Sequence, residues 1–176
     1  MKALVVYESM YGNTATIAAA IAVALRSQGL EADARAVSKV APIAAADVDL
    51  LVIGGPTHAH GMSRAGTRKT AVDDEKNTFS EPTVSPGLRE WMDDLPAGNG
   101  RQAAAFDTRI DKPAFLTGSA AKGIARRLER HGYRVVVGAE SFFVTTKNLL
   151  LEGEVDRATT WAVGVAASSR ARTSTL

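Results

Sequence analysis

Hydrophobic and polar positions divide the chain into two kinds of segment that follow one another in turn. Short, nearly continuous apolar runs, such as residues 3–7 and 49–53, are typical of strands buried on both faces of a parallel sheet. Residues 14–28 are rich in alanine and predict a helix, which Gly29 is placed to end. Residues 31–37 alternate apolar with polar side chains, and this pattern predicts a strand at the edge of the sheet.

The rest of the chain continues this succession of strands and helices. The further elements that we predict are a short helix at 88–95, a strand at 102–106, a helix at 119–131, a strand at 133–137 with an irregular continuation to 144, and a closing helix at 154–167. Strand and helix thus alternate five times. This order predicts an α/β domain with a doubly wound, five-stranded parallel sheet between helices, a three-layer α/β/α arrangement.

Two segments do not fit this alternation. Residues 57–86 form a long polar stretch with little periodicity, and the polar chain from Ser168 onward predicts a frayed end. The 176 residues otherwise contain no linker or internal repeat. We therefore expect a single domain over residues 1–170, with residues 171–176 as a polar C-terminal tail.

The absence of cysteine excludes several classes of chemistry. A chain with no cysteine has no disulfide framework, thiolate zinc site, iron–sulfur cluster or cysteine nucleophile. Thiol redox chemistry is excluded for the same reason. Any electron transfer by this protein must therefore use a bound cofactor.

The charge balance and the apolar runs limit the kinds of binding partner and the cellular location that we expect. Twenty-one Lys and Arg residues against nineteen Asp and Glu give a net charge of +2, without the concentrated positive charge typical of nucleic-acid binding. The apolar run at 3–7 is too short for a signal-peptide core, and the longest helical apolar stretch, at 17–25, is under half a membrane span. We expect a cytoplasmic protein that binds neither nucleic acid nor membrane.

Candidate chemistry lies in the loops that follow the strands, because open α/β sheets bind ligands at the carboxyl ends of their strands. The first such loop contains the hydroxyls of Ser9 and Thr14, the amide of Asn13 and the flexible Gly12, and it enters a helix directly. Together with the helix N-terminus, these groups predict a phosphate cradle. The loop has no Lys or Arg, and the chain lacks GxxxxGK[ST] and GxGxxG, so a terminal phosphate fits better than a nucleoside triphosphate. The alternative is that Ser9 and Thr14 only cap the helix.

These residues resemble a known family. The first loop in its setting, VYESMYGNT at residues 6–14, resembles the FMN phosphate-binding signature of flavodoxins. Residues 49–57 (DLLVIGGPT) resemble that family's third strand and the loop over one flavin face, and residues 106–109 (FDTR) fall where its second flavin-flanking loop begins. Residues 132–136 and the helix with Trp161 fit the last strand and helix. The resemblance covers nearly the whole chain except residues 63–86.

The resemblance implies a flavodoxin-like sheet with FMN at its carboxyl edge. In that arrangement the first loop (residues 9–14) would hold the phosphate. The second loop (residues 56–61) would lie against or beside the isoalloxazine, and the third loop (residues 106–109) would border the ring and its pyrimidine edge. The implied cofactor-binding residues are Ser9, Met10, Tyr11, Gly12, Asn13, Thr14, Pro56, Thr57, His58, Ala59, His60, Gly61, Phe106, Asp107, Thr108 and Arg109.

The second loop departs from the family in its aromatic residues. Flavodoxins usually pack Trp or Tyr on the flavin, whereas this loop offers His58 and His60. If His60 lies over the ring, Gly61 is placed to donate its amide to N5 of the reduced flavin; if His58 does, Gly61 is too far along. The alternatives for the two histidines are metal ligation and solvent exposure. No carboxylate lies nearby in the sequence, so we expect no metal site.

The basic residues near the flavin-side loops are a second departure. Flavodoxins that shuttle electrons are typically acidic around the flavin, whereas this chain has Arg64, Arg68, Lys69 and Arg109 there. A cation near flavin N1 would stabilise the anionic reduced form and raise the potential. The alternative interpretation is that these residues are solvated loop charges.

The long polar stretch is the third departure, because it is either a lid over the flavin or disordered. Residues 73–77 are polar enough for disorder, whereas Phe79 and Val84 could dock on the domain. A lid would favour substrate chemistry over simple electron exchange. By their spacing, Trp91 and Trp161 are interpreted as packing residues of the core.

The sequence favours an FMN-binding redox protein that transfers electrons to a redox partner protein or a small-molecule acceptor. One alternative is an NAD(P)H-dependent FMN quinone reductase, which the basic loops and the long polar stretch at residues 57–86, called the insertion below, would suit. The other is a binding module of the same fold with weak or no FMN binding. No side chain in these loops is an obvious general acid or base, so we name no catalytic residue.

Overall fold

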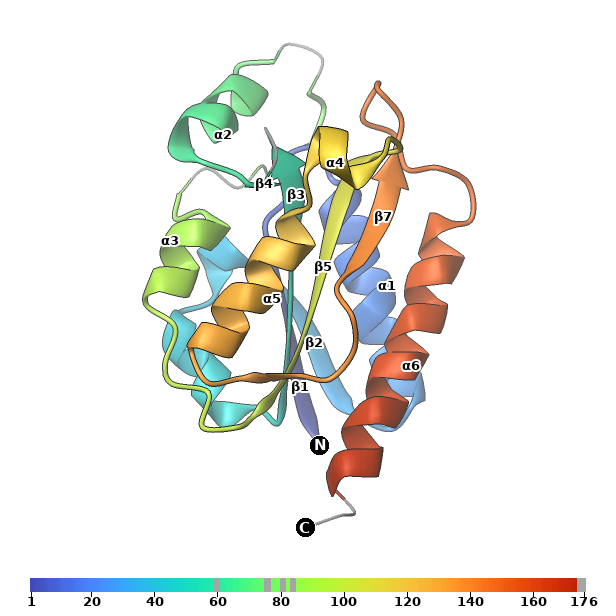
Figure 1. The fold of residues 1–176 in the computed structure, drawn as a ribbon. Helices are drawn as coiled ribbons and strands as arrows, with labels where there is room; N and C mark the ends of the chain where they lie inside the picture. Colours follow the sequence, from blue (N-terminus) through green and yellow to red (C-terminus); the bar gives the residue numbers. More distant parts are fainter. Residues whose placement is uncertain (59–60, 75–76, 80–81, 83–84, 174–176) are drawn as a thin grey trace.

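The computed structural model describes residues 1–58, 61–74, 77–79, 82 and 85–173. Its centre is a parallel sheet with helices on either side (Figure 1). The strand order is β2-β1-β3-β5-β6, the doubly wound order in which the first strand lies next to the third. The strands of this sheet are β1 (Lys2–Tyr7), β2 (Glu31–Ala36), β3 (Leu50–His58), β5 (Gln102–Ile110), β6 (Arg134–Val135) and β7 (Glu140–Val144). As predicted, β2 is an edge strand, since among the residues that the structure describes it pairs only with β1.

The prediction of five strands is wrong in number, because the described part of the chain forms a sheet of seven. β4 (Gly61–Met62) is a short strand that pairs antiparallel with β3, and the fifth parallel position is divided between β6 and β7, which both pair with β5. Four residues, 136–139, separate β6 from β7, whereas only two residues of β5, 104–105, separate the positions with which they pair. The extra residues cannot remain in the ladder, so the strand is interrupted and resumes farther along β5.

Helices cover both faces of the sheet, as predicted. One face carries α1 (Asn13–Ser27) and α6 (Glu154–Thr173), and the other carries α3 (Leu88–Asp93) and α5 (Ala120–Arg130). Alternate residues of β1 point to opposite layers, so that Val5 joins the core with α1 and Val6 the core with α3 and α5. The remaining helical elements are the 3-10 helices η1 (Val37–Lys39) and η2 (Pro42–Asp47) and the α-helices α2 (Ala65–Val72) and α4 (Ala114–Thr117).

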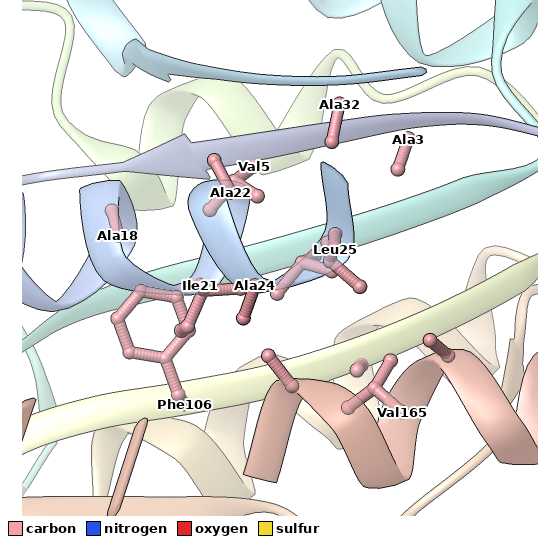
Figure 2. Close-up of a cluster of buried hydrophobic side chains, with 14 of the residues drawn as sticks. Ala3, Val5, Ala18, Ile21, Ala22, Ala24, Leu25, Ala32, Phe106 and Val165 are labelled. Carbon is pink, nitrogen blue, oxygen red and sulfur yellow. The ribbon is translucent and has the colours of Figure 1, made fainter. Parts of the chain in front are cut away.

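The core between the sheet and α1 is closed by Phe106 of β5. Figure 2 shows its ring next to Ile21 of α1, with Val165 of α6 farther along the same layer. The ring also lies flat against Gly54, because a Cβ atom added there would come within 2.0 Å of Phe106 Cζ. Phe142 and Trp161 meet the ring edge-on, with centroids 6.1 and 6.2 Å away. Trp161 is therefore a packing residue, as predicted.

The last helix is longer than predicted. Instead of ending at Ala167 in a frayed segment, α6 continues to Thr173. Two long-range contacts hold its final turns: Gln102 Nε2 of β5 donates to the Ser169 carbonyl at 3.0 Å, and Arg170 Nη1 donates to the Gln28 carbonyl at 3.0 Å. These contacts stabilise a polar segment whose own sequence does not favour a helix. No helix among the described residues is long and apolar enough to cross a membrane.

Candidate functional site

The three predicted loops meet at one end of the sheet, at the top of Figure 1, because the carboxyl ends of β1, β3 and β5 share that edge. Together they line a cavity of about 300 Å³, which we call the candidate cavity. Its lining residues are Met10, Tyr11, Asn13, Thr14, Pro56, Thr57, His58, Thr108, Arg109, Ile110, Val144 and Asn148.

The first loop has the backbone that the cradle prediction requires. Gly12 adopts φ +87°, a left-handed conformation that favours glycine, and α1 begins immediately after it. The amides in the first turn of a helix have no intrahelical acceptor and point out of its N-terminus. The alternative that Ser9 caps the helix holds in part, because Ala15 N donates to Ser9 Oγ at 3.3 Å. Ser9 and Gly12 shape the loop but are not among the residues that line the candidate cavity.

Thr14 connects the first loop to the third. Its side chain is buried, and its Oγ1 lies 2.8 Å from Thr108 Oγ1 of β5, with either hydroxyl able to donate. If Thr108 donates, the Thr14 hydroxyl hydrogen stays available to a ligand in the candidate cavity. A phosphate monoester held there would meet neutral donors and the positive end of the α1 dipole.

The second loop includes the antiparallel pair formed by β3 and β4. His58 at the end of β3 pairs with Gly61 of β4, and Ala59 and His60, between them, lie outside the described residues. His58 lines the candidate cavity, and Gly61 is not among its lining residues. Burial, reinforced by the positive charge of Arg68, lowers the pKa of His58 below its usual 6.5. At neutral pH the ring is therefore uncharged. Among the described residues, no group of three His, Asp or Glu side chains could hold a metal ion.

The third loop divides its side chains between two faces, because successive residues of a strand point in opposite directions. Thr108 faces α1 and the candidate cavity. Phe106 lies deeper on that face, wholly inside the core, and does not line the cavity. Arg109 lines the cavity, but its guanidinium lies 4.8 Å from the Phe143 ring centroid and Nη1 donates to Thr117 Oγ1 at 3.2 Å.

Asp107 points away from the candidate cavity and holds the start of α5. Its Oδ2 accepts hydrogen bonds from Ala121 N at 2.9 Å, Ser119 Oγ at 2.8 Å and Thr57 Oγ1 at 2.9 Å. Thr57 in turn accepts from Ala120 N at 2.8 Å, so the ends of β3 and β5 are joined to the helix. Of the implied third loop, the structure thus brings Thr108 and Arg109 to the cavity, and Phe106 and Asp107 serve the fold.

Three lining residues come from places that the sequence prediction did not include. Ile110 is the last residue of β5, Val144 ends β7, and Asn148 lies in the turn that follows. Asn13 Nδ2 donates to the Asn148 carbonyl at 2.8 Å, which ties this turn to the start of α1. The sequence feature that could have predicted the contribution of this turn was the irregular continuation of the last strand to Val144, because a strand of that length brings the following turn to the carboxyl edge.

A buried charge cluster fixes the insertion beside the candidate cavity. Arg68 of α2 is only 3% exposed, and it donates to Ser63 Oγ at 3.2 Å and to Glu90 Oε1 at 3.0 Å. Glu8, wholly buried at the end of β1, accepts from Leu88 N at 2.7 Å. Burial raises the pKa of Glu8 above its usual value, against the lowering effects of that hydrogen bond and of Arg68. Arg68 is therefore an internal anchor of α2 and not a solvated loop charge.

Comparison with known proteins agrees with this geometry. Residues 4–80 match the sequence model of a family described as flavodoxin domain, and no curated protein sequence matches the chain. A flavodoxin from the domain Archaea superposes with a TM-score of 0.68 at 18% identity, covering 97% of this chain and 99% of that one. The flavodoxin of Streptococcus pneumoniae TIGR4 gives 0.68 at 20% identity, covering 95% and 99%.

A WrbA-like flavodoxin protein from Agrobacterium tumefaciens is also similar, with a TM-score of 0.61 at 18% identity and coverage of 96% of this chain and 97% of that one. At these identities the structural likeness establishes the fold over nearly the whole chain. The chain therefore has the flavodoxin fold, and its residues 4–80 match the sequence model of the flavodoxin domain.

Proposed function

We propose that the protein binds FMN in the candidate cavity and transfers electrons through it. The convergence of the three loops on one cavity at the N-terminus of α1 supports this proposal most strongly. When bound, FMN supplies reversible transfer of one or two electrons. The part of the chain is then to bind the cofactor, orient it and set its surroundings.

The phosphate would lie at the first loop, where the donor set fits it. Thr14 offers a buried hydroxyl, Asn13 an amide, and the first turn of α1 its backbone N–H groups. The loop from Ser9 to Thr14 contains no Lys or Arg. Neutral donors at a helix N-terminus suit the terminal phosphate of a mononucleotide, which needs no magnesium ion to screen it.

The flavin ring would lie between the second and third loops. Pro56, Thr57 and His58 would flank it on one side, and Thr108 and Arg109 on the other. An uncharged imidazole has a polarisable face that can stack on a flat heteroaromatic ring, although more weakly than Trp. The lowered pKa of His58 supports this role, since a protonated imidazole in that position would resist desolvation by the ring.

Electron exchange would take place at the exposed rim of the candidate cavity. In the segments that follow β5 and β7, exposed apolar side chains include Phe115 at 82% and Leu116 at 54% in α4, and Leu149 after β7. Lys112 and Lys147 are exposed on the same two segments. A rim of this kind favours a redox partner protein with an acidic, partly apolar face. A small-molecule acceptor is the other candidate, and the expected cytoplasmic location stays a prediction.

A second candidate function is an NAD(P)H-dependent FMN quinone reductase. The observation that favours it is the insertion, whose helix α2 is packed beside the candidate cavity by the buried Arg68. An ordered wall next to a flavin suits a site that holds a small substrate, more than a site left open for a partner protein. NADPH oxidation by the FMN-loaded protein with a soluble quinone, without any added protein, would favour this function.

Absorption spectroscopy tests the proposal. We expect the purified protein to retain flavin bands after FMN is added and the excess is removed. The double variant Ser9→Ala/Thr14→Val removes the two hydroxyls and should lose most of the bound flavin while keeping its far-UV circular dichroism. The matched control, Ser27→Ala/Thr160→Val, makes the same changes at the far end of α1 and on α6, and should retain FMN. If the folded wild type retains no flavin, the chain is a binding module that shares only the fold.

A further inference from the structure

We infer that residues Asp74, Asn77 and Phe79 of the insertion form a clasp that holds the phosphate-binding loop in its binding conformation. The expected effect on FMN binding rests on the proposed function. The clasp itself consists of contacts between the first loop and Asp74, Asn77 and Phe79. The first loop, residues 9–14, is therefore shaped in part by residues more than sixty positions later in the chain.

Two hydrogen bonds join the clasp to the first loop. Tyr11 Oη donates to Asp74 Oδ2 at 3.1 Å, and Asn77 Nδ2 donates to the Met10 carbonyl at 3.0 Å. The same Asn77 nitrogen also donates to the Ala71 carbonyl of α2 at 2.9 Å. Asn77 thus bridges the end of α2 to the backbone of the loop.

A packing contact completes the clasp. A Cβ atom built on Gly12 would come within 3.0 Å of Phe79 Cδ2, so the ring of Phe79 covers Gly12 on that side. Phe79 is held in turn by its backbone, because Phe79 N donates to Asn77 Oδ1 at 3.0 Å. Gly12 is the loop residue with the left-handed φ and the most conformational freedom. The ring therefore covers the one point where the loop would change shape most easily.

The clasp is attached to a fixed support. Arg68 anchors α2 to Ser63 and Glu90, and Arg89 Nη2 of α3 donates to the Met62 carbonyl at 3.0 Å. Gly87 leaves the space for this anchor, since a Cβ there would lie 2.0 Å from Arg68 Nη1. Because Asn77 also donates to the Ala71 carbonyl of this anchored helix, the clasp holds the loop from a fixed support.

The clasp acts through the loop and not on a ligand directly. Asp74 and Asn77 line a separate cavity of about 550 Å³ beyond Tyr11, and no clasp residue is among those that line the candidate cavity. These residues are accordingly positioning residues. A restrained loop loses less conformational entropy when it binds a phosphate, so the clasp should strengthen FMN binding and speed association.

Hydrogen exchange of the FMN-free protein tests the clasp without any cofactor. In Asn77→Ala and in Phe79→Ala we expect the amides of residues 9–16 to exchange about tenfold faster, the loss of roughly one hydrogen bond or packing contact. The amides of β5 should keep their protection. The control is Thr78→Ala, a change at the exposed residue between the two, and it should leave exchange unchanged. Phe79→Leu should restore most of the protection, because an apolar side chain still covers Gly12.

FMN titration gives the functional readout. Asn77→Ala and Phe79→Ala should bind FMN about tenfold more weakly, mainly through slower association, and Thr78→Ala should match the wild type. Unchanged exchange at residues 9–16 in both variants would overturn the inference. Faster exchange in a protein that binds no FMN in any form would leave the clasp standing and refute the proposed function instead. If Phe79→Ala also loses protection in β5, Asn77→Ala decides, since it removes only polar contacts.

Discussion

Replacing Phe106 with leucine should weaken the fold and leave the candidate cavity intact. The ring of Phe106 is fully buried, lies against Gly54 and meets Phe142 and Trp161 edge-on. Leucine fills much of the volume, so the main loss is the two aromatic pairs, each worth about 0.5–1.5 kcal/mol beyond burial. With the imperfect cover over Gly54, we expect a loss of about 2–3 kcal/mol in the free energy of unfolding.

Urea unfolding followed by circular dichroism measures this loss, and the dependence on urea should keep its slope while the midpoint falls. For a chain of this size the melting temperature should drop by about 4–12 °C. The control is Phe115→Leu, which changes the same residue type at an 82% exposed position of α4 and should shift stability by less than about 0.5 kcal/mol.

The same variant separates a core role from a cofactor role for Phe106. Under conditions where Phe106→Leu is fully folded, its FMN dissociation constant should stay within about threefold of the wild-type value, because the side chain does not line the candidate cavity. A folded variant with unchanged stability and at least tenfold weaker FMN binding would refute the placement of this ring in the core.

Three further predictions concern the charged residues around the site. Gly87→Ala should destabilise the protein, because the added Cβ would displace the buried guanidinium of Arg68; unchanged urea unfolding would contradict this. Burial raises the pKa of Glu8, so its contribution to stability is complete below pH 4.5 and is lost as the pH rises through the folded-state pKa. The stability of Glu8→Gln relative to the wild type should therefore increase from pH 4.5 to neutral pH. A difference between the two unfolding midpoints that is the same at pH 4.5 and at neutral pH would contradict this. Arg109→Ala should lower the midpoint potential of bound flavin, and an unchanged potential would place that guanidinium away from the ring.

Local patterns were enough to predict the α/β/α layers and the edge position of β2. The apolar runs that became β1 and β3 and the alanine-rich α1 are determined by periodicity within a few residues of one another. The first loop was also predictable, because Gly12 and the helix start are adjacent in sequence. The apolar period of each strand and helix, and the left-handed glycine just before α1, are encoded within the segment itself.

The features that were missed depend on contacts between distant segments. The last turns of α6 are helical because Gln102 and Gln28 hold them, and α2 is docked by a buried Arg68 instead of an apolar stripe. A charged residue gives no burial signal in a hydrophobic pattern. The division of the fifth strand into β6 and β7 likewise depends on pairing with β5, which no local pattern records.

The third loop shows the same limit at the site. Its position at the carboxyl edge followed from the order of elements, but the direction of each side chain did not. Asp107 holds the N-terminus of α5, and Phe106 fits Gly54 on the neighbouring strand. Both directions are set by what lies across the sheet or above it.

The most direct test of the phosphate cradle compares FMN with riboflavin, which lacks the phosphate. Flavin fluorescence is titrated with the wild type and with Ser9→Ala/Thr14→Val. We expect the wild type to bind FMN at least about tenfold more tightly than riboflavin, because hydrogen bonds to a charged phosphate are the strong ones at this loop. The double variant should lose most of that difference. Equal affinity of the wild type for the two flavins would contradict the assignment of the first loop as a phosphate cradle.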